Sequence, residues 1–251
     1  MMANTKTKNG TPPDEWYTDA ANYWESVEPT VQGMLGGFGF LTTIDAKASL
    51  EFIDEFVTPK TVGCSPVLST TMACDCGAGI GRVSESFLLN VFDKVDLVEQ
   101  NPQFLETAQD NFTKAGMAHR VDSYIALGLQ EFEPKSGVYD LIWCQWVLGH
   151  LKDDDLIDFF KRCKKGLKPG GMIGLKENIA KHGILVDQED SSVTRSDVVF
   201  RDLIDRAGLK IIKEQLQIGF PKELFAVKIL GKYSVSDKLY TRISIIAVEY
   251  L

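Results

Sequence analysis

The chain has 251 residues, of which 44% are hydrophobic and 25% charged, the composition of an ordinary soluble globular protein with room for one α/β domain and additions. Its net charge of −8 argues against nonspecific binding to DNA or RNA, which requires clustered lysine and arginine side chains. The polar N-terminus and the lack of any apolar run of about 18 residues argue against a signal peptide and a membrane span, so we expect a cytoplasmic protein, with the nucleus as a second location.

The cysteines indicate a reducing compartment. There are five, an odd number, at Cys64, Cys74, Cys76, Cys144 and Cys163. They form no CxxC pair, and the chain has only three histidines, so neither a disulfide framework nor a zinc site is indicated and we predict no bound metal. Cys74 and Cys76 fall two apart on a predicted strand, where burial in the core is the favoured interpretation.

The first sixty residues are predicted to form a flexible tail at 1–12 and a helical cover at 13–60. The first helix begins near Pro13, and one of its faces carries Trp16, Ala20, Tyr23, Trp24 and Val27. Pro29 ends it, a glycine-rich loop follows at 30–40, and Asp45 is the predicted N-cap of a second helix that runs to residue 59. The aromatic face is typical of core packing, but its place before a flexible loop also suits a lid over a pocket.

From residue 66 onward, strand and helix patterns alternate. The predicted strands are 66–73, 94–99, 120–126, 139–146 and 172–176, followed by strand-like segments at 209–217 and 240–250. The predicted helices are 83–92, one that begins at Asn101-Pro102 and closes at Gly116, 154–167 and 196–207, with a turn at 168–171. This alternation predicts an α/β fold with a mostly parallel sheet.

A glycine-rich loop follows the first predicted strand, with glycines at 77, 79 and 81 and an arginine at 82. Ligands of such sheets bind at the carboxyl ends of the strands, where Glu99, Gln130 and Gln145 also fall. Glu99 lies 22 residues after Gly77, close to the separation at which a nucleotide-binding fold places the acid that binds the ribose hydroxyls.

The loop favours S-adenosylmethionine over other nucleotide cofactors. A dinucleotide fingerprint reads GxGxxG, whereas this chain has GxGxG and places Arg82 where the last glycine belongs. Arginine at the start of a helix suits a small carboxylate, which S-adenosylmethionine has, rather than a pyrophosphate. A phosphate-binding loop is excluded because no GK[ST] follows the glycines.

The chain resembles the class I S-adenosylmethionine-dependent methyltransferases, and among them the α-N-terminal protein methyltransferases that modify Xaa-Pro-Lys N-termini. The resemblance covers residues 17–217. It rests on YW..VEPTVQGMLGGFG at 23–39, DCGAGIGR at 75–82, GLQEF at 128–132, IWCQWVLGHL at 142–151, KEN at 176–178 and DQEDSSVTRS at 187–196. It implies a Rossmann-like methyltransferase domain at 61–251, with a mostly parallel seven-stranded sheet that ends in an antiparallel C-terminal hairpin.

The resemblance also implies the site residues. S-adenosylmethionine, and its product S-adenosylhomocysteine, would bind to Gly77, Gly79, Arg82, Glu99, Gln100, Asn101, Leu129, Gln130 and Gln145, covered by Trp24, Met34 and Gly36. The substrate N-terminus would face Tyr23, Trp146, Asp187, Ser192 and Tyr240. An α-ammonium group must lose a proton before it can be methylated, so Asp190 and His150 are the candidate general bases and Asn178 orients the amine. The rings of Trp146, Trp24, Tyr23 and Tyr240 would suit a growing quaternary ammonium by cation–π attraction, which allows repeated methylation.

The chain departs from the family pattern in places. Glu99 and Glu177 stand where the family often has aspartate, and the best match to its last strand and substrate-facing tyrosine is at Tyr240, which leaves about fifteen extra residues at 222–236. A rival alignment puts Phe225 in that place and loses the hydroxyl.

Three other functions stay open from the sequence. A small-molecule methyltransferase would keep the same cofactor site, and a noncatalytic binding module would keep the fold alone. An NAD oxidoreductase is opposed by Arg82.

Overall fold

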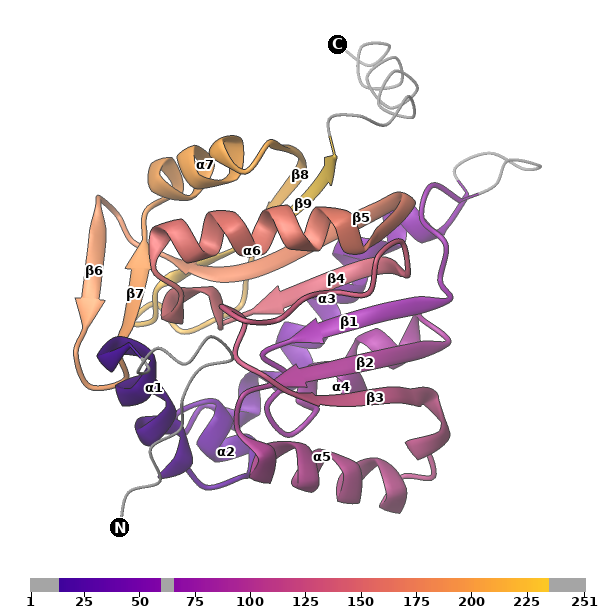
Figure 1. Ribbon diagram of the computed structural model, residues 1–251, viewed down its shortest axis with the longest axis horizontal. Coiled ribbons are helices and arrows are strands. Elements are labelled where there is room, and N and C mark those ends of the chain that lie inside the picture. Colours follow the sequence, from indigo (N-terminus) through magenta and orange to yellow (C-terminus); the bar gives the residue numbers. More distant parts are fainter. Residues whose placement is uncertain (1–13, 60–65, 235–251) are drawn as a thin grey trace.

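A computed structural model describes residues 14–59 and 66–234 of the chain. Seven strands form one sheet in the order β3-β2-β1-β4-β5-β9-β8, with helices on both faces (Figure 1). The strands are β1 Met72–Cys76, β2 Lys94–Glu99, β3 Val121–Ala126, β4 Tyr139–Gln145, β5 Leu167–Ile179, β8 Leu209–Leu216 and β9 Ala226–Ser234. The first five are parallel neighbours, and β9 is antiparallel to both β5 and β8. The predicted α/β fold with an antiparallel C-terminal hairpin is confirmed.

Helices cover both faces of this sheet (Figure 1). They are α1 Glu15–Glu25, α2 Val31–Met34, α3 Thr42–Val57, α4 Arg82–Ser86, α5 Pro102–Lys114, α6 Asp153–Gly166 and α7 Asp197–Arg206. Short 3-10 turns lie at η1 Gly39–Leu41, η2 Leu88–Asn90, η3 Ala118–Arg120 and η4 Leu148–His150. In Figure 1, α6 crosses the near face of the sheet, α3 and α4 lie behind it, and α1 and α2 lie beyond the carboxyl ends of its parallel strands.

Each face of the sheet has its own apolar core, because successive side chains of a strand point to opposite faces. Cys74, Cys76 and Cys144 pack with α6 and α7, whereas Ala73 and Trp143 pack with α3, α4 and α5. The burial predicted for Cys74 and Cys76 is confirmed, and both are free thiols, as are the buried Cys144 and Cys163. Cys64 lies outside the described residues. Within the described ranges, no helix is long and apolar enough to span a bilayer.

Three local predictions need correction at the front of the chain. The expected loop at 30–40 contains α2 and η1, and Thr30 caps α2 by accepting a hydrogen bond from the Gly33 N–H. The first strand begins at Met72 and not at residue 66. The helix after the glycine loop stops at Ser86, because Phe87 leaves the helical region with φ −131° and ψ −65°.

The second half of the chain holds three further differences. The turn expected at 168–171 is a bulge within β5, where the pairing register with β4 shifts. The segment 184–195 forms an unpredicted hairpin of β6 Ile184–Asp187 and β7 Ser192–Arg195, beside the sheet in Figure 1. Finally, Ala226–Ser234 supplies a strand, β9, that the sequence did not predict, and the strand expected at 240–250 lies outside the described residues.

Candidate functional site

The glycine loop between β1 and α4 has a backbone that only glycine accommodates easily. Gly77, Gly79 and Gly81 have φ of +74°, +53° and +82°. A Cβ on Gly77 would lie 2.5 Å from Cγ2 of Val147, and one on Gly79 would lie 2.9 Å from Sδ of Met34. The loop therefore passes close to Val147, which follows β4, and to Met34 of α2 in the N-terminal segment.

The carboxylate of Glu99, at the end of β2, is bonded to this loop. Its Oε2 accepts a hydrogen bond from the Gly79 N–H at 3.0 Å, and its Oε1 accepts one from the Asn101 N–H at 2.9 Å. Burial raises the pKa of Glu99. Asn101 itself caps α5, with its Oδ1 accepting from the Gln103 N–H.

The loop after β3 forms the opposite wall. Arg162 of α6 donates to the backbone carbonyls of Leu129 at 2.8 Å and of Gln130 at 3.2 Å. A distant helix thus fixes the backbone of two residues for which the sequence predicts cofactor contacts.

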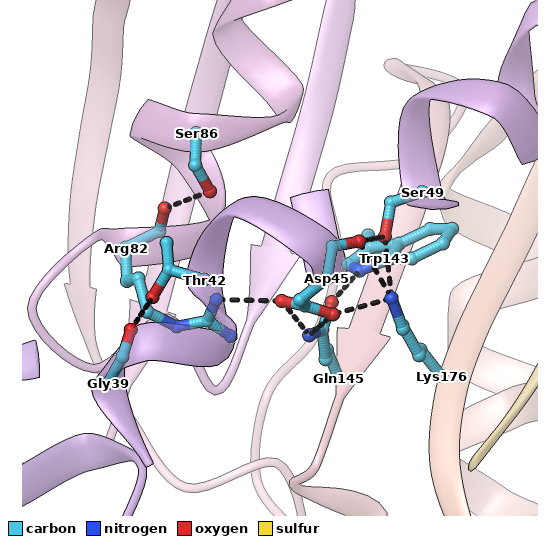
Figure 2. Close-up of polar contacts among 9 residues, drawn as sticks. All are labelled: Gly39, Thr42, Asp45, Ser49, Arg82, Ser86, Trp143, Gln145 and Lys176. Carbon is cyan, nitrogen blue, oxygen red and sulfur yellow. Dashed lines mark hydrogen bonds and ion pairs between the residues drawn. The ribbon is translucent and has the colours of Figure 1, made fainter. Parts of the chain in front are cut away.

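Behind the loop lies a buried polar cluster centred on Asp45 (Figure 2). Its carboxylate accepts from Arg82 Nη1 at 2.7 Å and from Gln145 Nε2 at 2.8 and 2.9 Å, and it pairs with Lys176 Nζ at 2.5 Å. Burial lowers the pKa of Lys176. The prediction that Asp45 is an N-cap is wrong: Asp45 lies inside α3, whose N-cap is Leu41, and its side chain points into the protein.

A cavity spans these elements. It is lined by loop and strand-end residues Gly77, Gly79, Arg82, Glu99, Gln100, Leu129, Gln130, Gln145 and Trp146, and from the N-terminal segment by Tyr17, Ala20, Trp24, Met34 and Leu35. Ten of the twelve predicted cofactor residues therefore meet in one place, counting Trp24 and Met34. Gly36 and Asn101 do not line it.

A second cavity adjoins the first, and Trp24, Met34, Leu35, Trp146 and His150 line both. Its other walls include Phe38, Glu177, Asn178, Asp190, Ser192, Phe220, Leu224 and Phe225. The three predicted catalytic residues and two of the five predicted substrate residues, Trp146 and Ser192, lie here.

Trp146 stands between the two cavities in an uncommon backbone conformation. Its φ is +53°, and the guanidinium carbon of Arg82 lies 5.4 Å from its ring centroid. The centroid of the Phe220 ring lies 6.3 Å from that of the Trp146 ring. Glu177 supports the turn that follows, since its Oε1 accepts from the N–H groups of Val147 and Leu148, and burial raises its pKa to about 7.

The tip of the β6–β7 hairpin brings acids to this region. Asp190 Oδ1 is buried without a hydrogen-bond partner among the described residues. Burial raises the pKa of Tyr23 on α1, and the nearby carboxylates of Asp190, Glu189 and Asp187 add to that rise. Tyr23 and Asp187 therefore lie near Asp190 without lining the cavity, and Asp187 is exposed.

The last predicted substrate residue, Tyr240, lies outside the described residues, and its role stays a prediction. Phe225, directly before β9, lines the second cavity instead. The preference for Tyr240 rested on a last strand at 240–250, so the position of β9 favours the rival alignment with Phe225.

Asp45 is the residue that the sequence argument most clearly missed. A usable signal exists, since Asp45, Ser49, Phe52 and Phe56 recur at helical spacing on one buried face of α3. A carboxylate on such a face requires a buried partner. Within the described residues, no group of three or more His, Cys, Asp or Glu side chains is arranged to hold a metal ion.

Comparison with known proteins agrees with this geometry. Residues 12–232 match the family model described as AdoMet dependent proline di-methyltransferase. The chain is 48% identical over 216 residues to alpha N-terminal protein methyltransferase 1 of Dictyostelium discoideum, with 85% of this chain and 78% of the relative covered. It is 44% identical over 216 residues to N-terminal Xaa-Pro-Lys N-methyltransferase 1 of Danio rerio, with 86% and 94% covered. A solved SAM-dependent methyltransferase from Leishmania major superposes with a TM-score of 0.80 at 33% identity, covering 90% of this chain and 94% of that one.

Proposed function

The chain belongs to the family of AdoMet-dependent proline di-methyltransferases, and we propose that it methylates the α-amino group of protein N-termini that begin Xaa-Pro-Lys. The observation that carries this proposal is the pair of adjoining cavities. One holds the residues expected for the cofactor, the other holds Asn178, Asp190 and Ser192, and Trp146 and His150 line both.

The residues of the first cavity fit S-adenosylmethionine. The Glu99 carboxylate is held by backbone N–H groups at a strand end, which is the placement that ribose hydroxyls require. Arg82 lines the cavity, and a guanidinium has five N–H donors, so its bond to Asp45 leaves others for a carboxylate. The positively charged Arg82 therefore suits an incoming carboxylate. When bound, the cofactor supplies an electrophilic methyl group.

The second cavity supplies the acceptor chemistry. A protonated α-amine has no lone pair, so a base must take its proton before the nitrogen can accept a methyl group. Asp190 Oδ1 is the candidate base because it is buried and unpartnered among the described residues. The Asn178 side chain orients the amine. The proton passes to Asp190, and the freed nitrogen lone pair would then form the new bond to the methyl carbon as the carbon–sulfur bond breaks, with the electron pair of that bond left on the sulfur of S-adenosylhomocysteine.

The surrounding groups fit the rest of the substrate. Trp146 offers an aromatic face to the methylated, cationic product. The acids Asp187 and Glu189 at the hairpin tip, and the net charge of −8, favour approach of a substrate lysine.

Mass spectrometry of peptides tests this function. A peptide beginning Ser-Pro-Lys or Gly-Pro-Lys, incubated with the protein and S-adenosylmethionine, is expected to gain one or more methyl groups at its α-amine. An N-acetylated copy is the control, since it has no free amine. No gain on any Xaa-Pro-Lys peptide, with transfer to small amines instead, would contradict the peptide substrate and favour a small-molecule methyltransferase. No calorimetric heat with S-adenosylhomocysteine would favour a binding module.

A further inference from the structure

Both ring nitrogens of His150 are already engaged. The indole N–H of Trp24 donates to Nε2 at 3.0 Å, and Nδ1 lies 3.1 Å from the carbonyl oxygen of Ser191. An indole nitrogen can only donate, so Nε2 carries no proton. In the neutral ring the proton is therefore on Nδ1, which donates to the Ser191 carbonyl. His150 joins α1 on one side to the hairpin tip on the other.

This arrangement conflicts with a role as the general base. Nδ1 already holds a proton, and Nε2 could accept one only by giving up its bond to Trp24. We propose that His150 is a positioning residue, which holds α1 over the cofactor cavity through Nε2 and holds the Asp190 segment through Nδ1–H. The proposal rests on the proposed function, in which Asp190 takes the proton.

The contact with α1 is one of several that attach this helix to residues 150–155. Trp16 Nε1 donates to the backbone carbonyl of His150 at 2.8 Å, and the Tyr17 hydroxyl bonds to Asp155. Tyr17 and Trp24 also line the cofactor cavity. Among these contacts, the Trp24 bond lies at the wall between the two cavities, so its loss is expected to loosen the cover directly over the cofactor.

The contact with the hairpin acts on a strained residue. Ser191 is buried and has a φ of +51°, a left-handed backbone conformation that is strained in residues other than glycine. Arg195 fixes the base of β7 by donating to the carbonyls of Leu148 and Leu151. The tip, with Asp190 directly before Ser191, depends on the His150 Nδ1–H bond.

Two amide variants separate the two bonds. The side chain of His150→Asn places a donor where Nδ1 stands, and that of His150→Gln places an acceptor where Nε2 stands. Neither amide is a base. We expect His150→Asn to lower the affinity for S-adenosylhomocysteine about 10-fold, which corresponds to the loss of roughly one hydrogen bond, and to lower kcat less than 10-fold. His150→Gln is expected to lower kcat about 10-fold or more with a smaller change in S-adenosylhomocysteine affinity.

A third variant and a second readout complete the test. Trp24→Phe should match the affinity loss of His150→Asn, because it removes the same donor. Hydrogen exchange should rise at amides 189–192 in His150→Gln and at α1 in His150→Asn. Equal losses of kcat near 100-fold in both amide variants, with unchanged S-adenosylhomocysteine affinity and exchange, would overturn the proposal and make His150 the base. Unchanged affinity and exchange in all variants would overturn it too. Calorimetry and hydrogen exchange need no peptide, so they test the role of His150 independently of the substrate. If the wild-type protein methylates no Xaa-Pro-Lys peptide, only the proposed substrate is contradicted.

Discussion

Arg82 of the glycine loop donates to the carboxylate of Asp45 at 2.7 Å, and both side chains are buried. Asp45 comes from α3, before the first strand, whereas Arg82 begins α4 after it. The N-terminal segment therefore supplies the counter-ion for the arginine that faces the cofactor cavity. Folding of α3 onto the sheet and formation of the cofactor site are coupled by this pair.

Asp45→Asn tests that coupling. The variant leaves Arg82 and Lys176 buried without their counter-ion, and we expect this to lower the free energy of unfolding by about 3–5 kcal/mol. We also expect it to weaken the binding of S-adenosylhomocysteine. Urea unfolding and calorimetry measure the two effects. Glu51→Gln on the same helix is the control, because its pair with Lys47 is exposed and is worth less than about 1 kcal/mol. An Asp45→Asn variant as stable as the control would contradict the coupling.

Asp190→Asn tests the proposed base. The amide keeps the shape of the side chain and cannot accept the amine proton, so kcat should fall about 100-fold or more with little change in S-adenosylhomocysteine affinity. Asp187→Asn, at the exposed end of β6, should instead raise KM for a lysine-containing peptide. Steady-state kinetics separates the two, and near wild-type kcat in Asp190→Asn would remove Asp190 from the role.

Glu177 gives a prediction on pH. Burial raises its pKa from an ordinary value of 4.5 to about 7, so the folded protein holds this proton more tightly than the unfolded chain does. The contribution of Glu177 to stability is therefore lost as pH rises from about 4.5 to 7, and is level above that.

Glu177→Gln does not titrate, so wild type should lose stability relative to this variant as the pH is raised from about 5 to about 8. The expected loss is roughly 1.4 kcal/mol for each pH unit between the starting pH and the raised pKa of Glu177. Asp75, whose pKa burial raises to about 6, is present in both proteins and cancels in the difference. Urea unfolding of wild type and Glu177→Gln at both pH values measures this difference in stability. A stability difference that does not change with pH would rule out titration of Glu177 in this range.

Phe225→Ala tests the second cavity as the peptide site. The ring lines this cavity and is 46% exposed, so its removal should raise KM for the peptide about 10-fold, the loss of roughly 1.4 kcal/mol of contact. S-adenosylhomocysteine affinity should stay the same, since Phe225 does not line the first cavity. Ile218→Ala is the matched control, because Ile218 is 77% exposed and lines neither cavity. An equal KM in both variants would place the peptide elsewhere.

The sequence by itself determined the features that short-range patterns control. The second strand begins and ends at the predicted residues 94 and 99, and α5 begins at Pro102 after an Asn101 cap. Gly77, Gly79 and Arg82 meet Glu99 at one cavity, as strand-end placement predicts. Local dihedral preferences, capping and side-chain periodicity act over a few residues, so they are readable without the fold.

Only the tertiary structure decided the contacts between distant segments. Asp45 bonds to residues 37, 100 and 131 positions away, whereas its local sequence pattern predicted a helix cap. The β6–β7 hairpin, the strand β9 after Phe225 and the two partners of His150 depend in the same way on which segments meet in space. Such contacts depend on how the whole sheet packs, so they cannot be predicted from the residues that are adjacent in sequence. The sequence thus determined the cofactor loop, and the tertiary structure decided that Asp45 fixes its arginine.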